Sequence, residues 1–214
     1  MSPEVTSTLT STMTSTMKFT RHLFIACLLA NTQAEAAQLD VSKFNETEVQ
    51  LLDQSKPDSN GKTFAAGTIL NAPVSKVCAT LQAYEDYPSF MPNTTKAKVA
   101  RQPDESALVD FTLNLPLGKV KKYRLKMMPK ASPATCYLSW KLQPWEGLKQ
   151  EETIADTSGY WDLTAVAGNP NKTVVKYQVF TDPGPVPMGL GWIVDSMSKD
   201  SIPKMMDALR NKLH

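Results

Sequence analysis

The chain has 214 residues, of which 42% are hydrophobic and 21% are charged, and its formal net charge is +2. These values are typical of a globular domain with a full core, and a small net charge without a block of Lys and Arg argues against nucleic-acid binding. The two histidines, His22 and His214, lie in the N-terminal segment and at the last position. A domain without an internal imidazole cannot carry a Ser-His-Asp or Cys-His arrangement and lacks the usual nitrogen ligands of zinc. Carboxylates alone could still bind a metal, but no Asp/Asn/Gly loop has calcium spacing, so we expect no metal and no cofactor.

The N-terminal segment has the pattern of a secretory signal peptide. Lys18 and Arg21 give a basic start, residues 23–30 form an apolar run, and residues 34–36 (AEA) provide a small-x-small cleavage site. This order of basic, apolar and small residues is typical of such leaders, and the apolar run is too short to span a bilayer.

The pattern predicts that residues 1–36 are removed by cleavage after Ala36 and that translation begins at Met17 or Met13. The mature protein is then expected in the periplasm or outside the cell. Two alternatives remain open at this point: a buried N-terminal helix of the fold, and a lipoprotein anchored through Cys27.

The mature chain begins with a polar N-terminal extension, residues 37–62, followed by a predicted strand at residues 64–71. Pro73 then opens a helix, because proline is tolerated in the first helical turn. A second short helix is expected around residues 84–90. The first helix has one apolar face at helical spacing, formed by Val74, Val77, Cys78 and Leu81.

Cys78 and Cys136 remain after cleavage of the leader. In an oxidising compartment they could form a disulfide, and the alternative is two small buried hydrophobic side chains. The sequence leaves both open.

From residue 96 the hydrophobic period changes from helical to two, which is typical of strands. Short turn-forming segments, among them Ser158-Gly159, separate the candidates, and short connections imply an antiparallel meander. The strand candidates are residues 96–101, 107–115, 120–128, 135–143, 148–155, 160–167 and 173–181.

The alternation predicts one apolar and one solvated face for this sheet. Asp110 and Arg124 fall on the solvated face, where pairing across two strands is expected. A C-terminal helix that ends near Lys212 and contains Pro203, which should kink it, is predicted to cover the apolar face. Its apolar stripe consists of Trp192, Ile193, Met197, Ile202, Met205, Met206 and Leu209.

Three segments resemble the START-like superfamily of polyketide cyclases and lipid-transport proteins (SRPBCC, helix-grip), in particular its exported bacterial members. They are residues 67–77 (GTILNAPVSKV), 84–92 (YEDYPSFMP) and 198–209 (SKDSIPKMMDAL). The resemblance implies an α+β helix-grip fold: a curved antiparallel sheet of about seven strands wrapped around a long C-terminal helix, with two short helices after the first strand. The ligand-binding domain would span residues 63–214, and one of the strand candidates would be irregular.

The resemblance further implies a cavity between sheet and helix, since members bind lipids, sterols, quinones or polyketides and a minority are enzymes. Trp145 and Met188 are candidates for the cavity mouth, with capping of the sheet end as the alternative for Trp145. For each predicted ligand-binding residue, packing in the hydrophobic core is the alternative role. The predicted ligand-binding residues are Phe111, Leu113, Tyr123, Leu125, Trp140, Tyr177, Val179, Trp192, Ile193, Met197 and Met205.

The sequence therefore predicts a protein that binds a hydrophobic small molecule or lipid, with transport of that ligand as a possible role. No nucleic-acid partner is expected, and transient membrane contact is left open. One alternative is a cyclase- or dehydratase-like enzyme acting on a polyketide or isoprenoid, although no catalytic residue can be assigned. Another is an interaction module without a ligand, in which bulky side chains fill the space. The oligomeric state stays undetermined.

Overall fold

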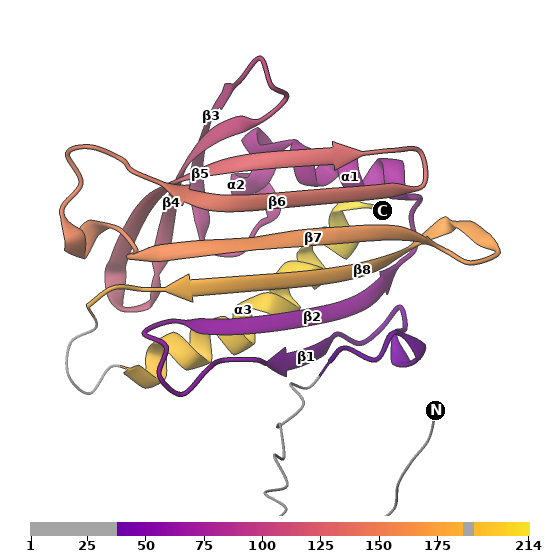
Figure 1. The fold of residues 1–214 in the computed structure, drawn as a ribbon, viewed down its shortest axis with the longest axis horizontal. Helices are drawn as coiled ribbons and strands as arrows, with labels where there is room; N and C mark the ends of the chain where they lie inside the picture. The colour runs from indigo at the N-terminus through magenta and orange to yellow at the C-terminus, as the bar shows by residue number, and fades with distance from the viewer. Residues whose placement is uncertain (1–37, 186–190) are drawn as a thin grey trace, which may run out of the picture. The chain divides into compact units, whose positions relative to one another are not determined.

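The computed structural model describes residues 38–185 and 191–214, with the side chains of residue 117 and residues 191–198 outside the description (Figure 1). The predicted leader and Met188 thus lie outside the described residues. Within them the chain forms one antiparallel sheet in the order β1-β2-β8-β7-β6-β5-β4-β3. Its eight strands are β1 (Gln50–Asp53), β2 (Lys62–Leu70), β3 (Thr94–Arg101), β4 (Ala107–Leu115), β5 (Lys119–Ala131), β6 (Thr135–Gln143), β7 (Asp156–Val166) and β8 (Asn169–Asp182).

The helices lie on one side of this sheet (Figure 1). The long helix α3 contacts β2 and α2, and α1 contacts β6, β7 and β8. They are α1 (Val74–Gln82), α2 (Tyr87–Phe90) and α3 (Gly191–Lys212), with single 3-10 turns η1 (Val41–Lys43), η2 (Tyr84–Asp86), η3 (Pro116–Gly118) and η4 (Gln150–Glu152). The predicted α+β helix-grip architecture is therefore confirmed, and α3 continues through Pro203.

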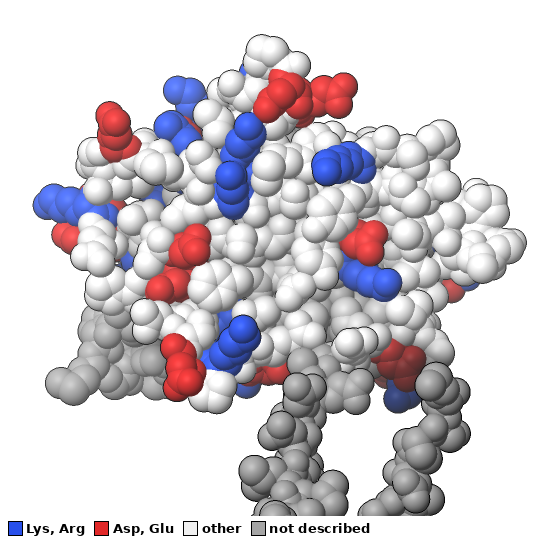
Figure 2. All heavy atoms as spheres, viewed as in Figure 1, with Lys and Arg blue, Asp and Glu red and all other residues white. Residues whose placement is uncertain are grey.

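Alternation along the strands places the core between the sheet and the helices. The four apolar residues predicted for α1 are all buried, and α3 buries Ile202, Met206 and Leu209 against the same side of the sheet. On the outer face the bidentate pair of Asp110 and Arg124 is present, with Nε–Oδ1 at 2.6 Å and Nη2–Oδ2 at 2.9 Å. Figure 2 shows side chains of both charge signs scattered over this outer face.

A disulfide joins Cys78 in α1 to Cys136 in β6, with 6.0 Å between their Cα atoms. Of the two alternatives that the sequence left open, the structure therefore has the disulfide rather than two separate buried thiols. The bond closes a loop with a sequence separation of 58 residues, so it fixes the first helix to the middle of the sheet.

The strand predicted at residues 148–155 is wrong. That segment contains η4 and irregular chain, and β7 begins at Asp156 and runs straight through Ser158-Gly159. Glycine is needed there for close approach rather than for a turn, because a Cβ on Gly159 would lie 2.4 Å from Cζ2 of Trp140 on the neighbouring strand and 2.3 Å from the Gln178 carbonyl oxygen.

The segment predicted as a polar extension also contributes to the fold. Its strand β1 pairs with β2, which adds the eighth strand to the predicted seven. The Phe44 ring lies against Gly67 so closely that a Cβ there would be 1.9 Å from Cζ. Thr68 Oγ1 lies 2.9 and 2.8 Å from the carbonyl oxygens of Asn45 and Glu48. Two contacts thus hold this segment on β2: the Phe44 ring packs into the space that Gly67 leaves, and the buried Thr68 hydroxyl binds the backbone of the segment.

Candidate functional site

A cavity of about 340 Å³ lies between the inner face of the sheet and α3. Its walls come from β4 to β8, from the α2–β3 connection and from α3, and most of the lining side chains are apolar or aromatic. Ligand pockets usually measure roughly 300–1,000 Å³ and have such linings, so this volume suits one small guest.

Eight of the eleven predicted ligand-binding residues line this cavity. The side chains of Trp192, Ile193 and Met197 lie outside the described part. Trp145, predicted at the mouth, is not among the described lining residues; instead its ring lies 5.3 Å below the Arg124 guanidinium, on the outer side of the sheet. The eight are Phe111, Leu113, Tyr123, Leu125, Trp140, Tyr177, Val179 and Met205.

Strand register brings these side chains together. Phe111 in β4 is directly opposite Tyr123 in β5, and their ring centroids are 5.7 Å apart. On the β6–β8 side, Tyr177 stacks on Trp140 with 5.7 Å between centroids and meets Trp161 at 4.6 Å. Aromatic pairs at such distances stabilise one another, so the rings form a continuous aromatic wall.

The hydroxyls of Tyr123 and Tyr177 have no hydrogen-bond partner among the described residues, whereas Tyr87 donates its hydroxyl proton to the Leu81 carbonyl at 2.6 Å. Burial raises the pKa of Tyr123 and of Tyr177, and the negative charge that Tyr123 would carry raises the pKa of Tyr177 further. Both phenols therefore stay neutral, and they offer hydrogen bonds to water or to a guest.

Lys121 is the one charged side chain among the described lining residues, and the sequence analysis missed it. It shares the alternation of Tyr123 and Leu125, which was the available signal, but its charge kept it out of the predicted apolar lining. Its ammonium donates to the Thr153 carbonyl oxygen at 2.5 Å. Burial lowers the pKa of Lys121, partly opposed by the charge of Glu151.

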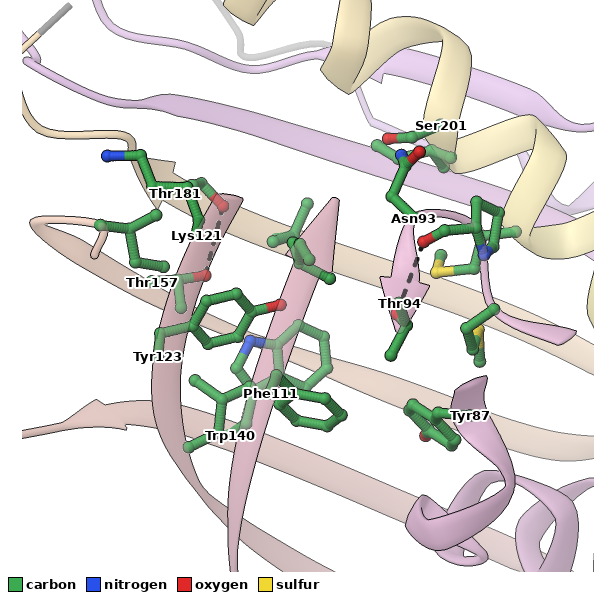
Figure 3. A pocket seen from close by; sticks show the side chains of 18 of the residues that line it. Tyr87, Asn93, Thr94, Phe111, Lys121, Tyr123, Trp140, Thr157, Thr181 and Ser201 are labelled. Atoms are coloured by element: carbon green, nitrogen blue, oxygen red, sulfur yellow. Dashed lines mark hydrogen bonds between the residues drawn. The ribbon is translucent and has the colours of Figure 1, made fainter. Parts of the chain in front are cut away.

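Thr157 and Thr181 lie at the same end of the cavity as Lys121, with their hydroxyl oxygens 3.2 Å apart (Figure 3). The opposite end holds Tyr87 and the α2–β3 connection with Asn93. Alternation with Tyr177 and Val179 could have identified the threonine on β8. No sequence signal identified the loop residues, because the period of a strand says nothing about a connection. The other lining residues that were missed are Met91, Pro92, Thr94, Leu115, Met127, Ile154, Trp161, Pro183, Ser201 and Ile202.

The described lining contains no carboxylate and no imidazole. Near Lys121, Glu152 forms an ion pair with Lys122 on the outer face, with 3.9 Å between Oε1 and Nζ. Within residues 38–185 and 191–214 no three His, Cys, Asp or Glu side chains gather in a way that could hold a metal ion. The arrangement can therefore enclose an apolar guest and donate hydrogen bonds to it.

No family model and no curated protein matches the chain. Solved structures do. A STAR-related lipid transfer protein from Xanthomonas axonopodis matches with a TM-score of 0.66 and 16% identity over 77% of this chain and 93% of that one.

The chain has the START fold. Human StAR-related lipid transfer protein 5 superposes with a TM-score of 0.66 at 12% identity, covering 79% of this chain and 83% of that one. The Zhui aromatase/cyclase from Streptomyces sp. R1128 does so with a TM-score of 0.57 at 11% identity, covering 72% and 93%. These three proteins with the START fold include two named for lipid transfer and one named as an aromatase/cyclase. At identities this low, the likeness to the present chain concerns the fold alone. None of the helices in the described ranges is long and apolar enough to cross a membrane.

Proposed function

We propose that the protein binds one hydrophobic small molecule or lipid between the sheet and α3, and that it serves as a carrier. The observation that carries the proposal is the cavity of about 340 Å³. Trp140, Tyr177 and Met205 border this space without filling it. An interaction module without a ligand would have the space closed by such side chains, so the cavity favours a binder.

The chemistry of the lining supports the proposal. Aromatic walls remove the apolar surface of a guest from water, which is worth roughly 0.8 kcal/mol for each methylene group of the guest that is buried. Two solved structures with the same fold are named as lipid transfer proteins, one from Xanthomonas axonopodis and one human.

Binding is tested by filling the cavity. We expect Leu113→Trp to weaken the binding of a fluorescent apolar probe at least tenfold, because the larger ring occupies guest space. Thr112→Phe, on the outer face of the same strand, is the matched control and should bind as the unmodified protein does. Val179→Phe repeats the test from β8, and circular dichroism checks that each variant folds. Probe binding that survives both inward substitutions would contradict the proposal.

The natural ligand is sought in protein purified from its own compartment. Native mass spectrometry should show a mass increment that disappears after extraction with organic solvent. Identification of the extracted compound then names the ligand, whereas protein that is always ligand-free and binds no apolar probe refutes the proposal.

We also propose that the working protein lies outside the cytoplasm, in the periplasm or the medium. The leader pattern of residues 1–36 supports this, and so does the disulfide between Cys78 and Cys136, since such bonds persist in oxidising compartments. Cell fractionation with mass analysis of the N-terminus tests it: the expected product begins at Ala37, and an intact leader on cytoplasmic protein refutes it.

A further inference from the structure

The strand β5 extends past the end of its neighbour β6. Pairing between the two begins at Arg124 opposite Gln143, the last residue of β6, so Lys121 lies beyond the paired region. Here the chain that connects β6 to β7 lies beside β5, and its Thr153 carbonyl oxygen accepts a hydrogen bond from the Lys121 ammonium. This end of the cavity is therefore bordered by a loop and a partly exposed lysine.

Lys121 differs from the lysines on the other face of the same strand. Lys122 pairs with Glu152 at 3.9 Å, and Lys126 pairs with Asp104 at 3.1 Å. Lys121 has one neutral carbonyl as its partner and makes no ion pair with a described carboxylate. An ammonium has three N–H donors, so two remain for another acceptor.

Figure 3 shows how this end is arranged. The Lys121 stem runs along the cavity wall and its ammonium points away from Tyr123 and Trp140, toward the edge of the lining. The hydroxyls of Thr157 and Thr181 lie beside the stem. A charged group on a guest would remain partly hydrated here, while the hydrocarbon reaches the aromatic walls.

We propose that the ligand is an amphipathic acid, whose carboxylate binds the Lys121 ammonium while its apolar body fills the cavity. The inference rests on the proposed function and names the chemical class of the guest. With one cation and no anion among the described lining residues, the site favours an acid, accepts a neutral ester less well and disfavours an amine.

A ligand series of one chain length tests the inference: dodecanoic acid, its methyl ester and dodecylamine, each displacing a fluorescent apolar probe at pH 7.5. We expect the acid to bind at least tenfold more tightly than the ester, and the amine to bind least. Lys121→Met should remove the tenfold preference for the acid over the ester. Lys122→Met, which makes the same charge change on the outer face, is the matched control and should keep the preference.

A second measurement does not depend on a variant. Dodecanoic acid with a ¹³C label in its carboxyl group is titrated in complex with the unmodified protein, and the pKa of the bound carboxyl should be lower than that of the same group in a detergent micelle. Equal affinity for acid and ester, or an unchanged carboxyl pKa, overturns the assignment of Lys121 while the proposed function stands. Failure of all three compounds to displace the probe also overturns the assignment, whereas protein that binds no apolar probe overturns the proposed function as well.

Discussion

Replacing Gly159 by alanine tests how the sheet makes room for the cavity wall. The added Cβ would lie 2.4 Å from Cζ2 of Trp140 and 2.3 Å from the Gln178 carbonyl oxygen. The ring can shift, but the carbonyl belongs to the backbone of β8. Overpacking of this kind costs about 1–3 kcal/mol, and we expect the upper part of that range because a main-chain atom must move.

A compensating effect is smaller. Alanine restricts the unfolded chain more than glycine does, which stabilises by about 0.4–1 kcal/mol. The net loss in the free energy of unfolding is then about 2 kcal/mol. For a domain of this size it corresponds to a decrease in Tm of about 4–8 °C.

Urea denaturation of Gly159→Ala, followed by circular dichroism, measures this loss, with Ser158→Ala on the opposite face as the control. Displacement of Trp140 should also alter tryptophan fluorescence and weaken binding of an apolar probe. Combining Gly159→Ala with Trp140→Leu should recover the share of the loss that comes from the ring, as a double-mutant cycle reveals. Unchanged stability and unchanged probe binding in Gly159→Ala would refute the reasoning.

Three further predictions concern the disulfide, the N-terminal segment and a buried tyrosine. Replacing Cys78 and Cys136 together by alanine should lower the free energy of unfolding by about 4 kcal/mol, because the unfolded chain regains the entropy that closure over the 58-residue separation removes. Urea denaturation measures this loss. An equal midpoint with and without reductant for the unmodified protein would contradict it. Phe44→Ala should lower the free energy of unfolding by about 3 kcal/mol in the same assay, because it removes the buried Phe44 ring that packs against Gly67. A change under about 0.5 kcal/mol would mean that the segment is dispensable for stability. Burial raises the pKa of Tyr84 to about 12, so its stabilising contribution is complete below pH 10 and is lost as the pH rises from 10 through 12; ultraviolet titration should show this phenol ionising later than exposed tyrosines, and Tyr84→Phe should flatten this part of the stability profile.

The elements that the sequence located most accurately are those with an uninterrupted period. The predicted bounds of β4 and β6 coincide with the observed strands, and α3 ends at Lys212 as expected. Alternating strands bounded by proline and glycine turns leave little freedom in where they end. The outer pair of Asp110 and Arg124 followed from alternation in the same way.

The errors arose where tertiary contacts decide the conformation. The glycine in β7 resembled a turn signal, although its role is to accept the Trp140 ring from the next strand. Likewise β1 has only four residues in a segment that is polar overall, and Phe44 of the same segment packs against Gly67 of β2. Neither relation is visible in a local window of sequence.

The site shows the same division. Inward-facing strand residues such as Phe111 and Tyr177 were found because alternation assigns a side chain to a face. The alternation along β5 assigns Lys121 to the inward face, but a charged side chain is more typical of the outward face. Its position became clear only when β5 was seen to outrun β6.

The strand overhang also bears on what the START fold does in this chain. The fold occurs in transfer proteins and in an aromatase/cyclase, so the lining has to decide. The described lining contains no carboxylate or imidazole, and burial keeps the phenols of Tyr123 and Tyr177 neutral. The one charge among the described lining residues is the Lys121 cation, at the edge of the cavity where β5 extends beyond β6. In the carrier that we propose, this cation would hold the polar end of the guest and the aromatic walls would enclose its apolar end.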